Sequence, residues 1–222
     1  MSEKNDLKQD IVKEKILKFI NTVQDNKTSV AQYAFGICLI IIGFLYYTDS
    51  KQMIDNEAKI LSGRAQNLYI DTKIDDAIVD FNNVIDAYPS TSSAIIAKFY
   101  LANDYMNNEM VDDALILFEQ ISSKIEDEVL QSSIFNKMGD IYLDKNELDE
   151  ALNHYKKAAN IKTTNSFKAL YLSNIAKIYK LQDDYIGSIG KIEEILEMED
   201  LKYNLKNEAQ QLRGELDFLI SR

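Results

Sequence analysis

A spacing of 37 residues recurs along this chain of 222 residues, and it constrains the fold more than any other feature. Four small residues mark it: Ala77, Ala114, Ala151 and Ser188. A second column of small residues keeps the same spacing and holds Ala65, Ala102, Gly139 and Ala176. A third column is large and mostly aromatic, with Leu68, Tyr105, Tyr142 and Tyr179. Agreement over four copies predicts stacked structural units, because one such unit cannot bury its apolar face alone.

Each unit is predicted to be a pair of helices, which makes the fold all-α. The chain has only 7 glycines and 1 proline, so it offers few places for sharp turns. The two helices of a unit are separated by polar residues that tolerate turn conformations, at 71–73, 107–109, 145–147 and 182–184. Four units then occupy residues 55–200. A capping helix over residues 202–222 is expected to follow, because Arg213 takes the place of the small residue.

The third unit, FNKMGDIYLDKNELDEALNHYKKAANI from Phe135, resembles the tetratricopeptide repeat, whose usual period is about 34 residues. The resemblance is weaker in the first and fourth units, where Arg64 and Ser188 depart from the family pattern. It implies a right-handed α-solenoid whose first helices line a concave groove. The tyrosine column is interpreted as core rather than as a platform for stacking nucleic-acid bases.

In this family the residue after the small column faces the groove, as do residues one helical turn to either side. The resemblance therefore implies a protein-binding groove that contains Gln66, Tyr69, Phe99, Asn103, Met106, Asn136, Asp140, Ser173 and Lys177. The groove changes from apolar and aromatic in the first two units to polar and cationic in the fourth. Such a surface suits an extended or helical peptide with an apolar anchor. Basic residues that would grip the C-terminal carboxylate of a chaperone are not assembled there, so that specific function is not expected.

Residues 30–47, VAQYAFGICLIIIGFLYY, contain no charged residue and predict a transmembrane helix over residues 30–48. At about 1.5 Å per residue this run spans roughly 27 Å, close to the ~30 Å of a bilayer's hydrocarbon core. A cleaved signal peptide is not expected, because the preceding segment is too long and no small-residue cleavage site follows. Cys38 lies inside the apolar run rather than before a polar mature start, so a lipoprotein signal also fits poorly.

Basic residues near the two ends of this span predict its orientation. Four precede it and three follow it: Lys13, Lys15, Lys18 and Lys27, then Lys51, Lys59 and Arg64. The excess on the first side predicts a cytoplasmic tail over residues 1–29 and a repeat domain across the membrane. The tail places Ile11 or Val12, Ile16, Phe19, Ile20 and Val23 at helical spacing, which fits either an amphipathic surface helix or a short solvated tail.

Composition and motifs give no sign of catalysis. The formal net charge is -11, and no basic face for nucleic acid is evident. Three acidic pairs, Asp75–Asp76, Asp112–Asp113 and Asp149–Glu150, stand at predicted helix starts, where they complement the helix dipole rather than hold a metal. A single His154, expected to be exposed, and a single Cys38 argue against a histidine metal cluster, a triad or an intrachain disulfide. We therefore expect no catalytic residue, no cofactor and no metal.

A short tail, one anchor, four repeats and a cap together resemble the ancillary subunit of the bacterial Sec translocon. That resemblance implies a single-pass protein of the bacterial inner membrane, with periplasmic repeats that meet emerging chains or chaperones. Two alternatives stay open. One is a scaffold for cell-envelope assembly or division, whose repeats contain a run like the one from Tyr88 to Tyr105. The other is an oligomeric structural protein in which repeats stack on the repeats of another copy.

Overall fold

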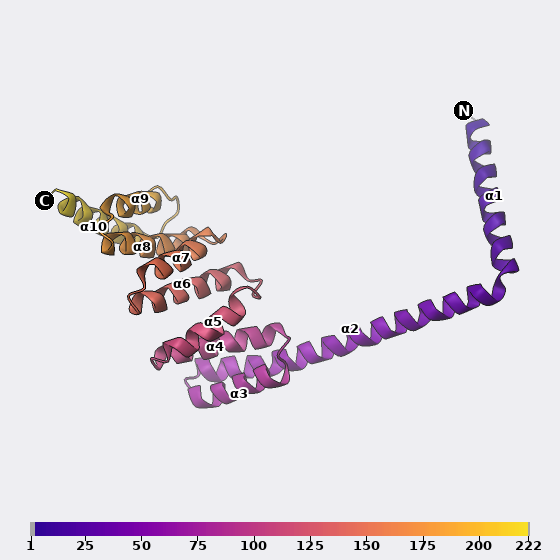
Figure 1. Ribbon diagram of the computed structural model, residues 1–222, viewed down its shortest axis with the longest axis horizontal. Helices are drawn as coiled ribbons and strands as arrows, with labels where there is room; N and C mark the ends of the chain where they lie inside the picture. The colour runs from indigo at the N-terminus through magenta and orange to yellow at the C-terminus, as the bar shows by residue number, and fades with distance from the viewer. Residues whose placement is uncertain (1–2, 222) are drawn as a thin grey trace. The chain divides into compact units, whose positions relative to one another are not determined.

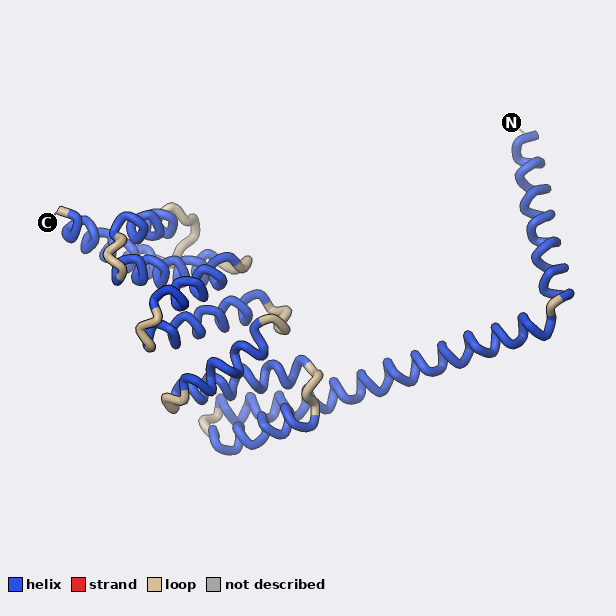
Figure 2. Tube along the Cα trace, viewed as in Figure 1, coloured by secondary structure: helices blue, strands red, loops and turns tan. Residues whose placement is uncertain are grey.

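The computed structural model describes the backbone of residues 3–221 and the side chains of residues 13–221. Over these residues the chain is helical, with turns and short loops between helices and no strand (Figure 2). The chain divides into two compact units, Met1–Ile54 and Asp55–Arg222. Within residues 3–221 the helices are α1 (Glu3–Asp25), α2 (Lys27–Ile70), α3 (Ile74–Ala87), α4 (Ser92–Asn107), α5 (Val111–Ser122), α6 (Glu128–Asp144), α7 (Leu148–Asn160), α8 (Asn165–Leu181), α9 (Tyr185–Leu196) and α10 (Tyr203–Ile220).

The first unit contains α1 and the beginning of α2, which are separated at Asn26. Helix α2 has the length and the apolar composition that crossing a membrane requires. Its apolar side chains are exposed, and Ile40, for example, is 74% exposed. The predicted transmembrane helix 30–48 and the start of the repeats at residue 55 fall within one helix, because α2 continues to Ile70. No proline interrupts this stretch, and the Thr48 hydroxyl donates to the Leu45 carbonyl at 2.8 Å within the helix.

The second unit is a row of helical hairpins, as the repeat predicted (Figure 1). The end of α2 pairs with α3, and α4–α5, α6–α7 and α8–α9 form the next three hairpins. Helix α10 packs on α9 and α8. The all-α solenoid is therefore confirmed in the described residues.

The turns inside the hairpins repeat the 37-residue period in backbone geometry. Their left-handed residues are Thr72, Glu109, Asn146 and Asp183, with φ of 61°, 62°, 60° and 60°. In each turn the next amide donates to the carbonyl of the large-residue column, as Lys73 does to Leu68 at 2.9 Å. This 6→1 bond and the left-handed residue before it are the Schellman ending of an α-helix. The predicted turn segments are thus confirmed.

The repeat columns form the core. Four members of the first small column are fully buried: Ala77, Ala114, Ala151 and Ser188. Large residues four positions later are buried with them: Phe81, Phe118, Tyr155 and Ile192. Tyr105, Tyr142 and Tyr179 are half-buried and pack against this core, as predicted. Burial of these side chains stabilises each hairpin by contact with the next one.

Threonines precede two helices, and the acidic pairs stand at the starts of three others. Thr91 caps α4, and its hydroxyl accepts from the Ala94 amide at 3.2 Å. Thr164 precedes α8 but makes no side-chain capping bond. The acidic pairs lie in the first turns of α3, α5 and α7, where their charge complements the helix dipole.

One prediction is wrong: His154 is buried rather than exposed. It is 7% exposed, and its ring lies parallel to that of Tyr142 at 5.2 Å between centroids. His154 occupies the position of Leu117 in the preceding hairpin, a side chain that is also partly buried against the core. Its polar neighbours in sequence, Asn153 and Lys156, suggested an exposed face, but a flat imidazole can stack where a leucine would pack.

Candidate functional site

The nine predicted groove residues all lie on the first helices of the hairpins. They are distributed as Gln66 and Tyr69 on α2, Phe99, Asn103 and Met106 on α4, Asn136 and Asp140 on α6, and Ser173 and Lys177 on α8. Eight are half-buried and Lys177 is exposed. These first helices present a face that is partly open to solvent, although contacts among the side chains differ from one end to the other.

Aromatic rings dominate the end formed by α2 and α4. Tyr69 and Tyr100 meet edge to face at 5.2 Å between centroids, and Tyr100 stacks on Phe81 at 5.0 Å. Phe99 contacts Tyr100 and, from the next helix, Phe118. Tyr100 was not singled out from the sequence, because Gly63, Lys137 and Asn174 occupy its position in the other units and give no repeat signal.

Hydrogen-bonded polar groups dominate the middle of this face. The Asn174 amide on α8 donates to Asn136 Oδ1 on α6 at 2.9 Å, and Asn136 Nδ2 donates to Asp140 Oδ2 at 3.1 Å. The Tyr155 hydroxyl on α7 donates to Asp140 Oδ1 at 2.7 Å. This network joins three helices. Sequence reasoning missed Asn174 and Tyr155 as its members, since their columns carry no polar pattern.

Burial shapes the electrostatics of this network. Partial burial raises the pKa of Asp140, and the hydrogen bond from Tyr155 opposes that rise. Burial also raises the pKa of Tyr155, with the hydrogen bond and negative charge of Asp140 as further causes. The two groups therefore favour a neutral phenol that donates to the carboxyl. The arrangement holds a proton donor and acceptors in fixed positions, but all of them already bond to one another.

Ser173 and Lys177 differ from the other groove residues because α10 lies near them. They line a cavity of about 40 Å³ together with Leu205, Glu208 and Ala209 of α10. An ion pair between Lys180 and Glu215 at 2.5 Å also links α8 to α10. The cap predicted from the sequence thus borders the fourth-unit end of the groove.

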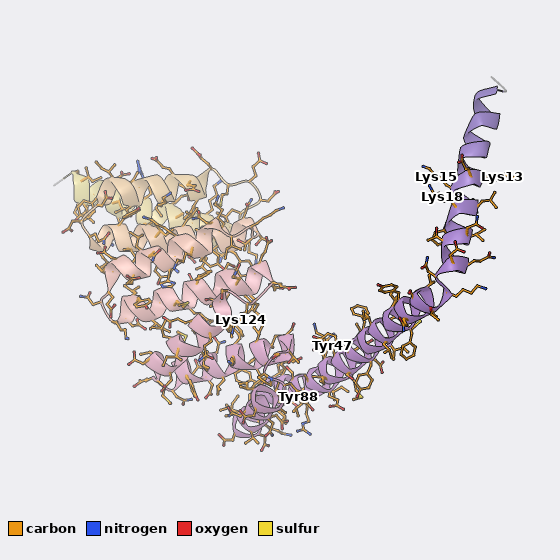
Figure 3. The ribbon with its side chains drawn as sticks, turned by 45° about the vertical axis from the view of Figure 1, so that its right-hand side comes forward. Lys13, Lys15, Lys18, Tyr47, Tyr88 and Lys124 are labelled. Carbon is orange, nitrogen blue, oxygen red and sulfur yellow. The ribbon has the colours of Figure 1, made fainter. Side chains whose placement is uncertain are left out.

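A cleft that the sequence did not predict lies between α4 and the loop that joins α5 to α6. Its volume is about 240 Å³, and its apolar lining includes Ile95, Ile96, Ile125 and Leu130. Lys124, labelled in Figure 3, and Asp127 also line this cleft. Residues 123–127 lie between helices and outside the repeat columns, so periodicity gave no indication of this cleft.

Among the described residues there is no group of three or more His, Cys, Asp or Glu side chains that could hold a metal ion. The members of each acidic pair are neighbours on a helix and therefore point in different directions. The chemistry available at the groove is hydrogen bonding and apolar contact.

The sequence model of one protein family, described as a tetratricopeptide repeat-like domain, matches residues 23–185. The chain belongs to this family. The match begins before the apolar residues 30–47 and so includes them with the repeats. No curated protein matches the sequence.

Solved structures of similar shape have low sequence identity to this family member. BtubC from P. vanneervenii has a TM-score of 0.56 at 14% identity, over 64% of this chain and 63% of that one. PilF of Pseudomonas aeruginosa has a TM-score of 0.56 at 12% identity, over 76% of this chain and 71% of that one. MamA has a TM-score of 0.53 at 16% identity, over 68% and 81% of the two chains. At these identities the likeness shows the fold alone.

Proposed function

We propose that this protein is a membrane-anchored adaptor that binds a segment of another protein on the first helices of its repeats and catalyses no reaction. The observation that carries the proposal is the continuous, half-buried face of aromatic and amide side chains on α2, α4 and α6. Tetratricopeptide-like units that stack in this way present extended surfaces, which generally serve protein binding.

The chemistry of this face favours a peptide with an apolar anchor at one end and a polar backbone or side chain at the other. Tyr69, Phe99 and Met106 provide apolar contact area, and aromatic rings contribute most to binding energy in such interfaces. Asn103 and Gln66 provide hydrogen-bonding groups between them. The exposed Lys177 adds a positive charge beyond Asp140.

The membrane anchor is the second part of the proposal. Its support is the uncharged run 30–47 within α2, whose apolar side chains face outward along the whole window that could span a bilayer. A family match that includes this run together with the repeats supports an anchor that stays attached to them. The lysine bias supports an orientation with the tail 1–29 in the cytoplasm and the repeats across the bacterial inner membrane, in the periplasm.

The resemblance in architecture makes the Sec translocon, with its emerging chains or periplasmic chaperones, the first partner to test. The test is photo-crosslinking in native membranes from Met106, on the groove face, and from the exposed Ile116 on α5 as a control position. Captured proteins are identified by mass spectrometry. Translocon subunits captured from Met106 and not from Ile116 would support this partner. Abundant capture of other proteins without translocon subunits would reject it.

A paired substitution tests the groove itself. Asn103 and Asn82 each donate to the backbone carbonyl four residues earlier, at 2.6 Å and 3.0 Å, but Asn82 lies on an exposed face of α3. Asn103→Arg places a long cation in the groove, whereas Asn82→Arg places it outside. We expect the first variant to lose crosslinking from Met106 and the second to keep it. Equal crosslinking in both variants would contradict the groove as the binding surface.

A cell-envelope assembly or division scaffold is the second candidate. The run from Tyr88 to Tyr105, which includes the helix cap Thr91 and the buried Ala94 and Ala97, favours it. Such scaffolds usually carry a cleaved signal or lipid anchor. An N-terminus that begins at residue 1 or 2 in the membrane fraction would therefore count against this candidate.

A further inference from the structure

We infer that α1 lies along the membrane surface, with its apolar side chains between lipid headgroups and its lysines at anionic lipid phosphates. The inference rests on the proposed function, because it requires that residues 30–47 cross the bilayer. Its starting point is that α1 is a helix of 23 residues rather than an irregular tail. The structure describes the side chains of α1 from Lys13 onward, so Ile11 and Val12 lie outside the described side chains.

The described part of α1 is two-sided. Ile16, Phe19, Ile20 and Val23 are three or four residues apart and therefore share one face of the helix. Three of them are open to solvent, with Ile16 52%, Phe19 70% and Ile20 43% exposed. An apolar face with a charged opposite face is the pattern of helices that lie in the interfacial layer of a membrane.

The charged face contains lysines. Lys18 lies on the side opposite Ile16, and Lys13 and Lys15 flank the apolar face; all three are labelled on α1 in Figure 3. Lys27 begins α2. From Lys13 to Lys27 there are four lysines and two acidic residues, Glu14 and Asp25, so this stretch is net positive. Lysines close to a bilayer are attracted to anionic lipids, each by roughly 1 kcal/mol near the surface.

Continuity with the anchor identifies the membrane as the surface that covers this face. Helix α1 ends at Asp25 and α2 begins at Lys27, so only a few residues separate Val23 from Val30, where the uncharged run starts. Once that run is inserted, α1 is held at the interface, and its apolar face is at the depth where headgroups meet acyl chains. A protein partner is the alternative occupant, and the experiment below distinguishes it.

The test uses the full chain in vesicles made of phosphatidylcholine with or without phosphatidylglycerol. Three single-cysteine variants are made in a Cys38→Ala background, and each is labelled with a fluorophore at its cysteine. The variants are Ile41→Cys in the span, Phe19→Cys on the apolar face and Thr22→Cys on the polar face. Brominated lipids quench a probe among acyl chains, and aqueous iodide quenches a probe in water. We expect lipid quenching at positions 41 and 19, and iodide quenching at position 22.

A double variant, Lys15→Gln with Lys18→Gln, tests whether the positive charge of α1 contributes to membrane binding. Glu14→Gln on the same helix is the control. Attraction of about 1 kcal/mol per lysine corresponds to an about fivefold change in the ratio of bound to free α1 for each lysine removed. This loss should appear with phosphatidylglycerol, shrink in pure phosphatidylcholine, and be absent in the control.

Each outcome decides the inference. Lipid quenching at position 41 with iodide quenching at both 19 and 22 would overturn it while leaving the anchor intact, and would leave the apolar face free for a protein partner. Iodide quenching at position 41 as well would overturn the anchor and the inference together. Lipid quenching at position 19 that is unchanged both by the lysine substitutions and by the charge of the lipid would overturn the role of anionic lipids.

Discussion

Arg64 binds Asp80 through two hydrogen bonds, from Nε to Oδ2 at 2.6 Å and from Nη2 to Oδ1 at 2.5 Å. Arg64 departs from the repeat pattern, since Leu101, Met138 and Ile175 stand at its position in the other units. Asp80 departs from it at the matching position of the second helix, where Leu117 stands in the next unit. The two departures compensate each other. The hydrogen bond and charge of Asp80 also raise the pKa of Arg64.

Removing one partner of this pair is expected to cost more than removing both. Arg64→Leu leaves the buried Asp80 carboxylate without its partner and should lower the melting temperature. Arg64→Leu with Asp80→Leu recreates the apolar pair Leu101 and Leu117 of the second unit and should be at least as stable as the natural protein. Thermal unfolding of the four proteins of this double-mutant cycle measures the effect. A double variant less stable than Arg64→Leu would contradict the compensation.

Gly139 is expected to be intolerant of a methyl group, although the other units have alanine at its position. A Cβ atom there would lie 2.6 Å from Cδ1 and Cε1 of the buried Tyr155 ring. Gly139→Ala should therefore destabilise the protein by about 1–3 kcal/mol through overpacking, despite a gain in helix propensity of roughly 1 kcal/mol. Urea unfolding measures the change.

The fourth unit offers a matched rescue for that substitution. There Ala176 faces Ile192 instead of a tyrosine. Gly139→Ala combined with Tyr155→Ile should cost less than the sum of the two single substitutions. Strict additivity would show that the ring of Tyr155 is not what excludes the methyl group.

His154 is expected to make stability depend on pH on the acidic side of neutrality. Burial lowers its pKa below the ordinary 6.5, and the charge of Lys157 lowers it further while Glu150 raises it. Above pH 6.5 both folded and unfolded chains hold a neutral imidazole. Below it the unfolded chain binds the proton more readily, so stability falls as pH falls.

His154→Leu, which copies Leu117, removes this titration. Urea unfolding at pH 7.5, 6.5 and 5.5 should show a loss toward low pH in the natural protein that is smaller in the variant. Carboxylates titrate in both proteins and cancel in the comparison. Parallel curves would mean that His154 binds the proton as readily in the folded chain as in the unfolded one.

Glu109 is expected to be a strained residue in its turn. Its φ of 62° is in the left-handed region, which costs about 1–2 kcal/mol for most side chains, and Asn146 fills the equivalent position with a residue that tolerates it. Glu109→Gly should stabilise the protein by about 1 kcal/mol more than Asn146→Gly does. Melting temperatures of the two variants test this ordering, and a larger gain at Asn146 would refute it.

Particular residues show how far periodicity predicts the fold. The columns of Ala77 and Phe81 are buried in all four units, and the turn residues from Thr72 to Asp183 adopt one conformation. These positions repeat because the same contact recurs between successive hairpins. Asp80, Tyr100, His154 and Asn174 break the repeat, and each takes its role from a neighbour on another helix. A spacing rule contains no information about such neighbours.

In the candidate groove, too, the repeat spacing predicts where residues lie along the chain but not which side chains they contact. Placement of its nine residues on the first helices of the hairpins came from the resemblance to the tetratricopeptide repeat, applied at the register of the small column. Their partners did not: Asn136 with Asn174, Asp140 with Tyr155, and Ser173 beside α10 are contacts between helices. Whether this face binds a protein segment stays a prediction for the crosslinking experiments.

By itself, the sequence determined the helical hairpins, their 37-residue register, the turns and the uncharged run 30–47, because each depends on local spacing and composition. Only the tertiary structure decided which departures compensate one another, that a histidine could be buried against Tyr142, and that α10 borders the groove. The physical reason is the distance along the chain over which each interaction acts. Helix propensity and amphipathic spacing act over a few residues, whereas these contacts depend on side-chain shapes brought together from different helices.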